Sequence, residues 1–346
     1  MSAGERQQNV ALVGALLVLV VLLALDIVLP GTVLSGSYAL AALITGAVTT
    51  VRRTAVMAVL AFALSSVSWI WNDNFASLDW DIRLVLTFIV GALAVVIATI
   101  RVRREHDLRR MTVIAETAQR AVLRAMPSAV GSLGFAARYV SATREALVGG
   151  DLYEVAESPY GVRVIVGDVR GKGLDAVQLA GTVLGAFRRS AFTQERLADI
   201  ARDLDAVVQA VAGDEDFVTA VLAEFHDDHT VTMVNCGHHP PLLVTGDSGA
   251  EVVPTGTPEP PLGLGPVPTS VTSGWPDGSR MLIYTDGLVE ARDRRGTFFP
   301  LGENAPLLRA GSLDEALDRL LDRLVAHTGR QITDDLALVL VEHRTT

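Results

Sequence analysis

Residues 161–177 read GVRVIVGDVRGKGLDAV, and this stretch predicts a strand, a glycine-rich turn and the start of a helix. Apolar residues recur in alternation up to Val169, as in a half-buried strand. The glycines of the turn tolerate backbone conformations that other residues avoid, and a helical pattern runs from Leu174 to Phe192. Asp168 therefore ends a strand, where its backbone is held rigidly while its carboxylate stays near solvent.

Outward from this stretch, the sequence after Pro127 predicts an α+β domain. Period-two runs that predict strands occur in FAARYVSA (135–142), FVTAVLAEFH (217–226), HTVTMVNCG (229–237), RMLIYTDG (280–287) and DDLALVLVEH (334–343). Further helical patterns cover Glu195 to Val211 and Ser312 to Val325. Short turns such as HDDHT join consecutive strands as hairpins, so we expect a largely antiparallel sheet with helices packed on it.

Three other acids share the position of Asp168 at a strand end beside a turn signal: Asp151 in GGDLYEV, Asp286 in IYTDGLVEA and Asp334 in ITDDLALVL. Each of them, taken alone, is most simply a turn residue. Together they are hard oxygen ligands that would repel one another unless divalent metal neutralised them, which favours Mg or Mn over zinc. Asp335 either supports this set or begins its strand.

The first hundred residues have a lipid-like composition, with four arginines and five acids. They contain four apolar runs, each near the roughly 17 to 25 residues that a helix needs to cross a bilayer. The runs lie at about Val10–Leu29, Thr32–Val51, Thr54–Ile70 and Leu84–Ile100. Residues 1–100 thus predict a four-span transmembrane domain. A secretory signal peptide is the competing interpretation of the first run, but no small-residue cleavage site is evident.

The charges of the short loops predict an orientation. Arg52 and Arg53 join the second and third runs, and the fourth run is followed by arginines at positions 101, 103, 104, 109 and 110. The loop NDNFASLDWDIR (72–83) is mostly acidic and lies near three tryptophans, which suit the headgroup level. Because positive charge stays inside, we expect a multi-pass protein of the inner (cytoplasmic) membrane with both termini in the cytoplasm.

Residues 101–126 predict one helical linker that leaves the membrane, because no Gly or Pro interrupts it before Met126-Pro127. A heptad seam along it could pair with a second chain in a homodimer. The seam consists of Leu108, Met111, Ala115, Ala118, Val122 and Ala125. Fewer than three heptads leave open the alternative that this stripe packs on its own domain. Residues 127–346 form the remaining domain.

Several classes of function are disfavoured. The net charge of -10 and the lack of clustered Lys and Arg in the soluble part argue against nucleic-acid binding. The single cysteine, Cys236, excludes an internal disulfide and a cysteine-rich metal site. His238 and His239 are adjacent and precede two prolines, so we expect a turn there rather than a metal site.

Six motifs in order carry a resemblance to a known family. GGDLYEV, GDVRGKGLDAV, NCGHHPPLL, PLGLG, YTDGLVEARD and DDLALVLV resemble the bacterial SpoIIE-type branch of the metal-dependent protein phosphatases, the PPM family. The match covers about residues 112–343. It implies an α-β-β-α sandwich with two Mn or Mg ions at one end of the sheets and serine/threonine phosphatase activity.

The resemblance also implies roles for individual residues. Asp151 and Asp168 would bind the metal pair, the backbone carbonyl of Val169 would help on one ion, and Asp286 and Asp334 would complete the set. A water that bridges the two ions would be the nucleophile, since two ions about 3.5 to 4 Å apart activate a shared water and hold the phosphoryl oxygens for in-line attack. Branch members commonly dephosphorylate anti-sigma-factor antagonists, so a phosphorylated protein of this class is the expected substrate.

Lys172 is the only lysine in the chain, yet we expect Asp168 to carry the chemistry. A phosphate-binding loop of the form G-x-x-x-x-G-K-[ST] would need a hydroxyl where Gly173 stands, and the preceding glycines are too close together. Lys172 either balances the carboxylates or meets the substrate phosphate, and an exposed loop lysine with no partner is the alternative. Arg170 stands where branch members often have serine, which puts substrate fit near it in doubt.

Two other functions compete with the phosphatase. GGDLY is similar to the GGDEF of diguanylate cyclases, but Leu152 replaces its second acid and the later motifs have no place there. A membrane-bound pseudophosphatase that only sequesters a signalling partner would usually have lost a ligand, whereas all four aspartates are present.

Overall fold

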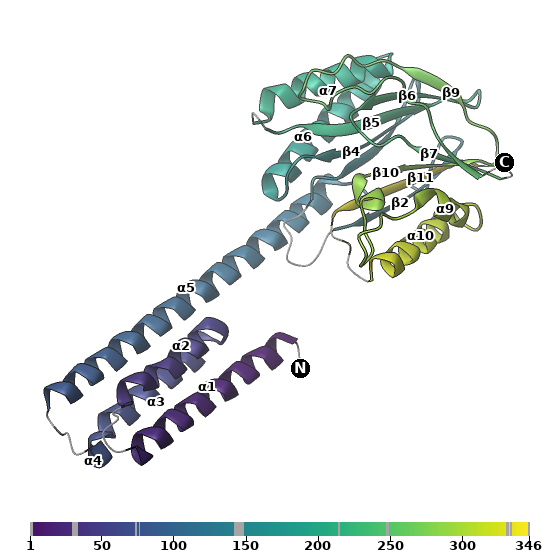
Figure 1. The fold of residues 1–346 in the computed structure, drawn as a ribbon. Helices are drawn as coiled ribbons and strands as arrows, with labels where there is room; N and C mark the ends of the chain where they lie inside the picture. Colours follow the sequence, from purple (N-terminus) through teal and green to yellow (C-terminus); the bar gives the residue numbers. More distant parts are fainter. Residues whose placement is uncertain are drawn as a thin grey trace. The chain divides into compact units, whose positions relative to one another are not determined.

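Helix α5 (Leu78–Val122) is the longest element of the protein and leads without a break from an apolar segment into a polar one. The computed structural model describes residues 3–29, 34–72, 75, 77–141, 149–213, 215–246, 249–329, 332 and 334–344. The chain divides into an N-terminal unit, Met1–Arg110, and a C-terminal unit, Met111–Thr346. Figure 1 shows the elements of each unit. The division falls inside the segment that the sequence predicts to be a linker.

The N-terminal unit is helical. It contains α1 (Ala3–Val28), η1 (Ser35–Tyr38), α2 (Ala39–Val48), α3 (Val51–Val67), α4 (Trp69–Asn72) and the first part of α5. Among the described residues, three helical segments are long and apolar enough to cross a membrane, namely Arg6–Val28, Val51–Asn72 and Leu78–Leu108. The second apolar run forms a shorter helix, Ser35–Val48, and Thr32 lies outside the described residues. The predicted count of four spans is therefore not confirmed.

One buried acid, Asp26, ties the end of α1 to its neighbours. Its carboxylate accepts hydrogen bonds from the Leu34 amide at 2.5 Å, the Tyr38 hydroxyl at 2.7 Å, the Trp71 indole at 3.0 Å and the Asn72 amide group at 3.3 Å. A buried carboxylate is tolerated only where such donors replace water. The polar contacts therefore join α1, η1 and α4 at this end of the unit.

Helix α5 ends at Val122, before the stop that the sequence predicts at Met126-Pro127. The Arg188 guanidinium donates a hydrogen bond of 3.1 Å to the Val122 carbonyl oxygen, which satisfies one of the last helical acceptors. Val122 packs against the core beneath α6, so this end of the heptad seam lies on its own domain. Leu108 and Met111 are 60% and 61% exposed. The side chains of Ala115 and Ala118 lie outside the described residues.

The C-terminal unit contains two antiparallel sheets. The first has the strand order β1-β2-β11-β10-β7-β8, and the second has the order β3-β4-β5-β6-β9. The first comprises β1 (Ala129–Val130), β2 (Leu133–Val140), β11 (Leu336–His343), β10 (Arg280–Tyr284), β7 (Leu242–Thr245) and β8 (Gly249–Val252). The second comprises β3 (Leu152–Ser158), β4 (Gly161–Val169), β5 (Val218–Phe225), β6 (Thr230–Cys236) and β9 (Val271–Gly274). Every pairing between these strands is antiparallel.

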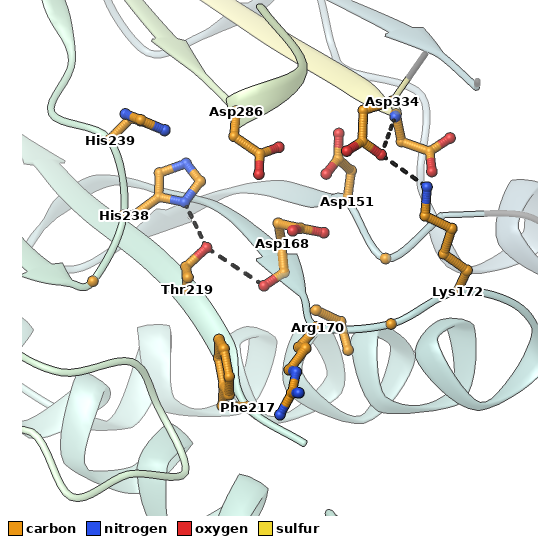
Figure 2. A pocket seen from close by; sticks show the side chains of 15 residues that line it. Asp151, Asp168, Arg170, Lys172, Phe217, Thr219, His238, His239, Asp286 and Asp334 are labelled. Atoms are coloured by element: carbon orange, nitrogen blue, oxygen red, sulfur yellow. Dashed lines mark hydrogen bonds and ion pairs between the residues drawn. The ribbon is translucent and has the colours of Figure 1, made fainter. Parts of the chain in front are cut away.

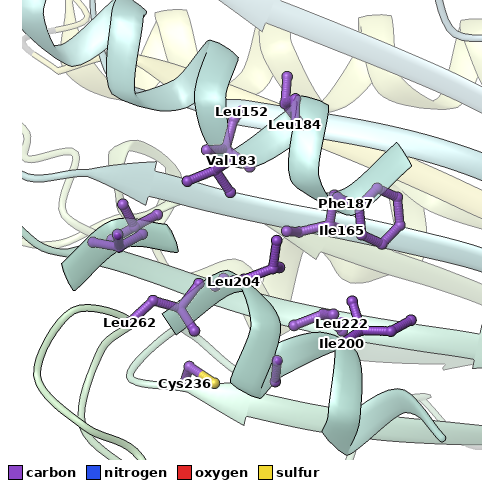
Figure 3. Packing of buried hydrophobic residues seen from close by; sticks show 14 of the residues in the cluster. Leu152, Ile165, Val183, Leu184, Phe187, Ile200, Leu204, Leu222, Cys236 and Leu262 are labelled. Carbon is purple, nitrogen blue, oxygen red and sulfur yellow. The ribbon is translucent and has the colours of Figure 1, made fainter. Parts of the chain in front are cut away.

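Three apolar layers hold this unit together. Helices α6 (Leu174–Thr193) and α7 (Leu197–Val211) pack on the second sheet, where Phe187, Leu204 and Leu222 are fully buried (Figure 3). A second layer fills the space between the sheets, and a third lies under α9 (Leu301–Asn304), η2 (Ala305–Leu308) and α10 (Leu313–Thr328) on the first sheet. The order of layers confirms the expected α-β-β-α sandwich.

The sequence misses some of the strands. For β3 the sequence indicates only a strand end at Asp151, because the pattern LYEVAES carries buried residues on consecutive positions rather than a clean alternation. Strands β7, β8 and β9 have four residues each, too short for a periodic signal. The predicted helices agree with α6, α7 and α10 to within a few residues. Ser312 caps α10 through a reciprocal pair of contacts with Glu315, a capping box.

Candidate active site

A pocket of about 340 Å³ opens at one end of the sandwich, where strand ends of both sheets meet (Figure 2). The second sheet contributes residues before β3, at the end of β4, at the start of β5 and after β6. The first sheet contributes residues after β10 and before β11. Strand ends on a rigid scaffold position side chains more accurately than loops do.

All eight residues that the sequence singles out line this pocket: Asp151, Asp168, Val169, Arg170, Lys172, Asp286, Asp334 and Asp335. They come from segments up to 184 positions apart in the chain. The sequence relates the aspartates through their common position at strand ends, and the family resemblance implies that they meet at one end of the sheets. Their individual roles remain predictions, and within the described part of the chain no three His, Cys, Asp or Glu side chains already stand at the spacing of a single metal site.

Asp151 is the most deeply buried aspartate of the set, with 2% of its surface exposed. Its Oδ2 accepts a hydrogen bond of 2.7 Å from the Thr285 hydroxyl. Thr285 in turn accepts a bond of 2.8 Å from the Ala337 amide, so one threonine joins β10, β11 and the residue before β3. This contact fixes Asp151 from the opposite sheet.

The carboxylates disfavour one another's ionised forms. Burial, followed by repulsion from Asp168, raises the pKa of Asp151 well above its usual value. Burial and then the charge of Asp286 raise the pKa of Asp168 to about 7. Burial and then Asp334 raise the pKa of Asp286 as well. A pocket of this kind attracts cations, because a cation relieves the repulsion.

Glycines let the backbone segments of the site approach closely. A Cβ on Gly150 would lie 2.4 Å from the Val169 carbonyl oxygen, and one on Gly149 would lie 1.9 Å from Asp335 Oδ2. A Cβ on Gly287, next to Asp286, would lie 2.0 Å from the Asp335 carbonyl oxygen. Each distance is far below normal contact, so these positions require glycine.

Two cations stand at the rim of the pocket. The Lys172 ammonium lies 3.2 Å from Asp334 Oδ1, and this contact raises the lysine pKa. Arg170 points away from the carboxylates (Figure 2) and donates a hydrogen bond of 2.5 Å to the Glu215 carbonyl oxygen. Its guanidinium also lies 5.4 Å from the centroid of the Phe217 ring. Lys172 therefore belongs to the carboxylate cluster in this arrangement, and Arg170 does not.

His238 is a site residue that the sequence argument assigned to a turn alone. The turn exists, since the His238 amide donates to Asn235 Oδ1 at 2.8 Å. The imidazole is buried and bridges the two sheets: Nε2 lies 3.0 Å from the Tyr284 carbonyl oxygen and Nδ1 lies 2.9 Å from the Thr219 hydroxyl. Since a carbonyl only accepts, Nε2 donates and Nδ1 accepts from Thr219.

Burial, with a smaller contribution from His239, lowers the pKa of His238 to about 3. The ring is therefore neutral near pH 7. It joins Thr219 of β5, which pairs with the strand that carries Asp168, to Tyr284, two positions before Asp286. No metal-ligand spacing marks His238 in the sequence. The available signal is its place directly after a strand, in a tight turn begun by asparagine.

The residues of this pocket fit a pair of divalent cations. Their side-chain donors are carboxylate oxygens, which Mg and Mn prefer. Asp151 is buried, Asp168 and Asp286 are partly buried, and Asp334 is nearly half exposed beside Lys172. Because Gly149, Gly150 and Gly287 have no Cβ, the backbone segments that carry the carboxylates can lie close together. The residues that would hold the ions are Asp151, Asp168, Asp286 and Asp334, with the carbonyl of Val169.

The sequence profile of the family described as Stage II sporulation protein E (SpoIIE) matches residues 158–344, more than half of the chain. The chain belongs to the SpoIIE family. The matched region of this SpoIIE domain contains β4, whose end carries Asp168, and runs through the strand that follows Asp334. Asp151 precedes the matched region.

Solved structures share the fold of the SpoIIE domain. The RsbU and RsbW domains of Rv1364c from Mycobacterium tuberculosis are 24% identical with a TM-score of 0.56, over 65% of this chain and 64% of that chain. The PP2C phosphatase domain of SpoIIE from Bacillus subtilis, with a fragment of its regulatory domain, is 18% identical with a TM-score of 0.52, over 62% of this chain and 64% of that chain. The PP2C domain of SiaA from Pseudomonas aeruginosa is 18% identical with a TM-score of 0.57, over 72% and 99%.

The chain thus spans 64% of the length of each of the first two structures. These likenesses establish the fold of the C-terminal unit as that of PP2C-type phosphatase domains.

Proposed function

We propose that the protein is a membrane-anchored, metal-dependent serine/threonine phosphatase. The observation that carries the proposal is the meeting of four strand-end aspartates from both sheets in one pocket of a SpoIIE domain. Structural carboxylates normally pair with cations, whereas these face one another with Lys172 at the rim. Ionisable groups perturbed in this way gather at functional sites.

Two Mn or Mg ions, when bound, would supply the positive charge that activates the attacking water and stabilises the transferring phosphoryl group. The chain's own residues position them. Asp151 is fixed by Thr285, and the rigid end of β4 presents Asp168. No covalent enzyme intermediate is needed, so the pocket requires no nucleophilic side chain.

The substrate phosphate would enter between the carboxylates and the rim cations. Lys172 is close enough to Asp334 to exchange this contact for a phosphate oxygen, because both side chains are nearly half exposed. Arg170 lies further out and would contact the protein part of the substrate. Asp335 is 5% exposed and lies next to Gly149 and Gly287, where it would support the cluster.

The substrate class follows from the family. SpoIIE and RsbU domains belong to signalling proteins, which supports a phosphorylated protein, and we take an anti-sigma-factor antagonist as the first class to test. The three long apolar helical segments support an inner-membrane location, with the arginine-rich ends and the catalytic unit in the cytoplasm. The seam on α5 supports a homodimer as one arrangement of the linker.

The test uses the full chain in detergent and follows release of phosphate from phosphoserine, phosphothreonine and phosphotyrosine peptides. We expect hydrolysis of the first two with Mn or Mg and none after chelation. Membranes washed with alkaline carbonate test the location, since a spanning chain stays in the pellet. A protein that binds phosphopeptides but releases no phosphate under any metal condition would instead support the pseudophosphatase, which sequesters a partner.

A further inference from the structure

A groove between α1 and α3 of the N-terminal unit has an apolar floor. Its volume is about 550 Å³, within the range of roughly 300–1,000 Å³ for ligand pockets. Leu12 and Leu16 of α1 line one wall, and Val56 and Leu60 of α3 line the other. Leu16, Val56 and Leu60 are 39%, 62% and 39% exposed, although they lie in segments long and apolar enough to cross a membrane.

The register of the two helices is fixed at the end of the groove. Arg53 Nη1 donates a hydrogen bond of 3.1 Å to Asn9 Oδ1, which joins α3 to α1. The lining residues of each helix follow this contact at the same spacing, three and seven positions further along. They form a continuous apolar channel that extends about 10 Å from its polar end, at about 1.5 Å per residue.

The polar end of the groove is strongly basic. Thr50, Arg52 and Arg53 line it, and the two arginines occupy the first turn of α3, which contains no acid. The positive end of a helix dipole disfavours cations, so an anion bound at this turn would be stabilising. Within the described part of the chain, neither arginine takes part in an ion pair.

We infer that this groove binds an anionic phospholipid, with its phosphate on Arg52 and Arg53 and an acyl chain between Leu16 and Val56. The inference rests on the proposed membrane location of the N-terminal unit. A long apolar channel with a basic mouth matches an acyl chain joined to an anionic headgroup. A second copy of the chain fits less well, because it would bring a second pair of arginines to the same place.

The experiment compares lipids and variants on the full chain in neutral detergent. The probes are phosphatidylglycerol, phosphatidylcholine with the same acyl chains, and inorganic phosphate. We expect phosphatidylglycerol alone to raise the midpoint of thermal unfolding and to remain bound in native mass spectrometry. Arg52→Gln with Arg53→Gln should weaken its binding about 30-fold, at about 1 kcal/mol for each arginine.

Matched variants separate this site from general charge attraction. Arg103→Gln with Arg104→Gln removes the same charge from exposed positions on α5 and should bind phosphatidylglycerol as the wild type does. Val56→Trp fills the channel, keeps the arginines and should abolish binding. Wild-type affinity in the Arg52 and Arg53 variant, or equal loss in the control, would overturn the inference.

Other outcomes identify a different occupant. An equal shift with inorganic phosphate would replace the lipid with a free anion, and an equal shift with phosphatidylcholine would remove the charge preference. A change of oligomeric mass in Val56→Trp without loss of lipid would assign the groove to a second copy. Release of the wild-type chain by alkaline carbonate would overturn the membrane location together with this site, whereas a retained chain without lipid preference would overturn the site alone.

Discussion

The Lys172 ammonium lies 3.2 Å from the carboxylate of Asp334, across 162 positions of sequence. The only lysine of the chain thus faces the aspartate cluster from the turn after β4. The contact rules out one of the alternatives that the sequence left open, an exposed loop lysine without a partner. Both side chains are nearly half exposed, so the pair contributes little to folding, at most about 1 kcal/mol.

Lys172→Gln tests whether this lysine serves the reaction. We expect kcat/KM for p-nitrophenyl phosphate to fall about 10-fold, because a rim cation that meets the phosphate is lost. The unfolding midpoint should hardly change. Lys172→Arg is the matched control and should keep most of the activity. Unchanged kcat/KM in Lys172→Gln would show that Lys172 takes no part in the reaction.

His238→Ala tests the bridge between the sheets. The substitution leaves the Tyr284 carbonyl and the Thr219 hydroxyl without their buried partner, at a cost of about 1–3 kcal/mol in the free energy of unfolding. Activity should fall about 10- to 100-fold, as when supporting contacts of a metal site are removed. Thermal unfolding and Mn-dependent hydrolysis measure the two effects. His239→Ala, one residue on, should change neither strongly.

Asp168 makes the metal-free domain sensitive to pH. Its pKa rises on folding from 3.8 to about 7, so the folded state holds a proton that the unfolded chain has released. The bound proton on Asp168 stabilises the folded state fully below the unfolded pKa of 3.8. This stabilisation is lost as the pH rises toward the folded pKa of about 7. In chelator, the unfolding midpoint of Asp168→Asn should therefore decline less than that of the wild type between pH about 4 and about 7.

Divalent metal should reverse this trend. Because protons compete with the ions for the same carboxylates, Mn should stabilise the wild type more at pH about 8 than at pH about 5. Stabilisation by Mn that is equal at both pH values would contradict the assignment of Asp168 as a ligand.

Gly150→Ala tests the close approach at the base of the pocket. Its Cβ would lie 2.4 Å from the Val169 carbonyl oxygen, so the turn must shift and metal-dependent activity should fall at least about 10-fold. Gly185→Ala is the control, since a Cβ there has no atom within 4 Å and the residue lies inside α6. That variant should be more stable by about 0.5–1 kcal/mol with full activity. Equal activity in both variants would show that the approach at Gly150 is not needed.

Met111→Cys tests the dimer along α5. Burial raises the pKa of the native Cys236 thiol to about 12, so the introduced thiol would be the reactive one. We expect disulfide-linked dimers from Met111→Cys and far fewer from Val113→Cys, which lies two residues on along the helix and off the seam. Equal yields from the two variants, or none, would favour a linker that packs only on its own domain.

The sequence predicts most strands and helices of the C-terminal domain well because strand and helix periods are local properties, whereas the sandwich itself follows from the resemblance. Strand β4, the turn and helix α6 follow directly from residues 161–177, and the four aspartates share a signal that can be seen without a structure. Their meeting at one end of both sheets follows from the resemblance, since spacing alone cannot show which strand ends face one another.

The parts that sequence reasoning missed depend on long-range contacts. The role of His238 rests on Thr219 and Tyr284, which are 19 and 46 positions away. The carbonyl of Val122 at the end of α5 is satisfied by Arg188, which is 66 positions further along the chain. The second apolar run has enough apolar residues for a span. Its helix is shorter, since a break separates the end of α2 at Val48 from the start of α3 at Val51.

The most direct test of the phosphatase compares Asp168→Asn with Asp322→Asn in Mn-dependent hydrolysis of p-nitrophenyl phosphate by the full chain. Asp322 is an exposed residue of α10, so the two variants lose the same charge. We predict that the wild type and Asp322→Asn hydrolyse the substrate only with Mn or Mg, and that Asp168→Asn loses at least about 100-fold while remaining folded. Full activity in Asp168→Asn, or hydrolysis that survives chelation in the wild type, would contradict the account.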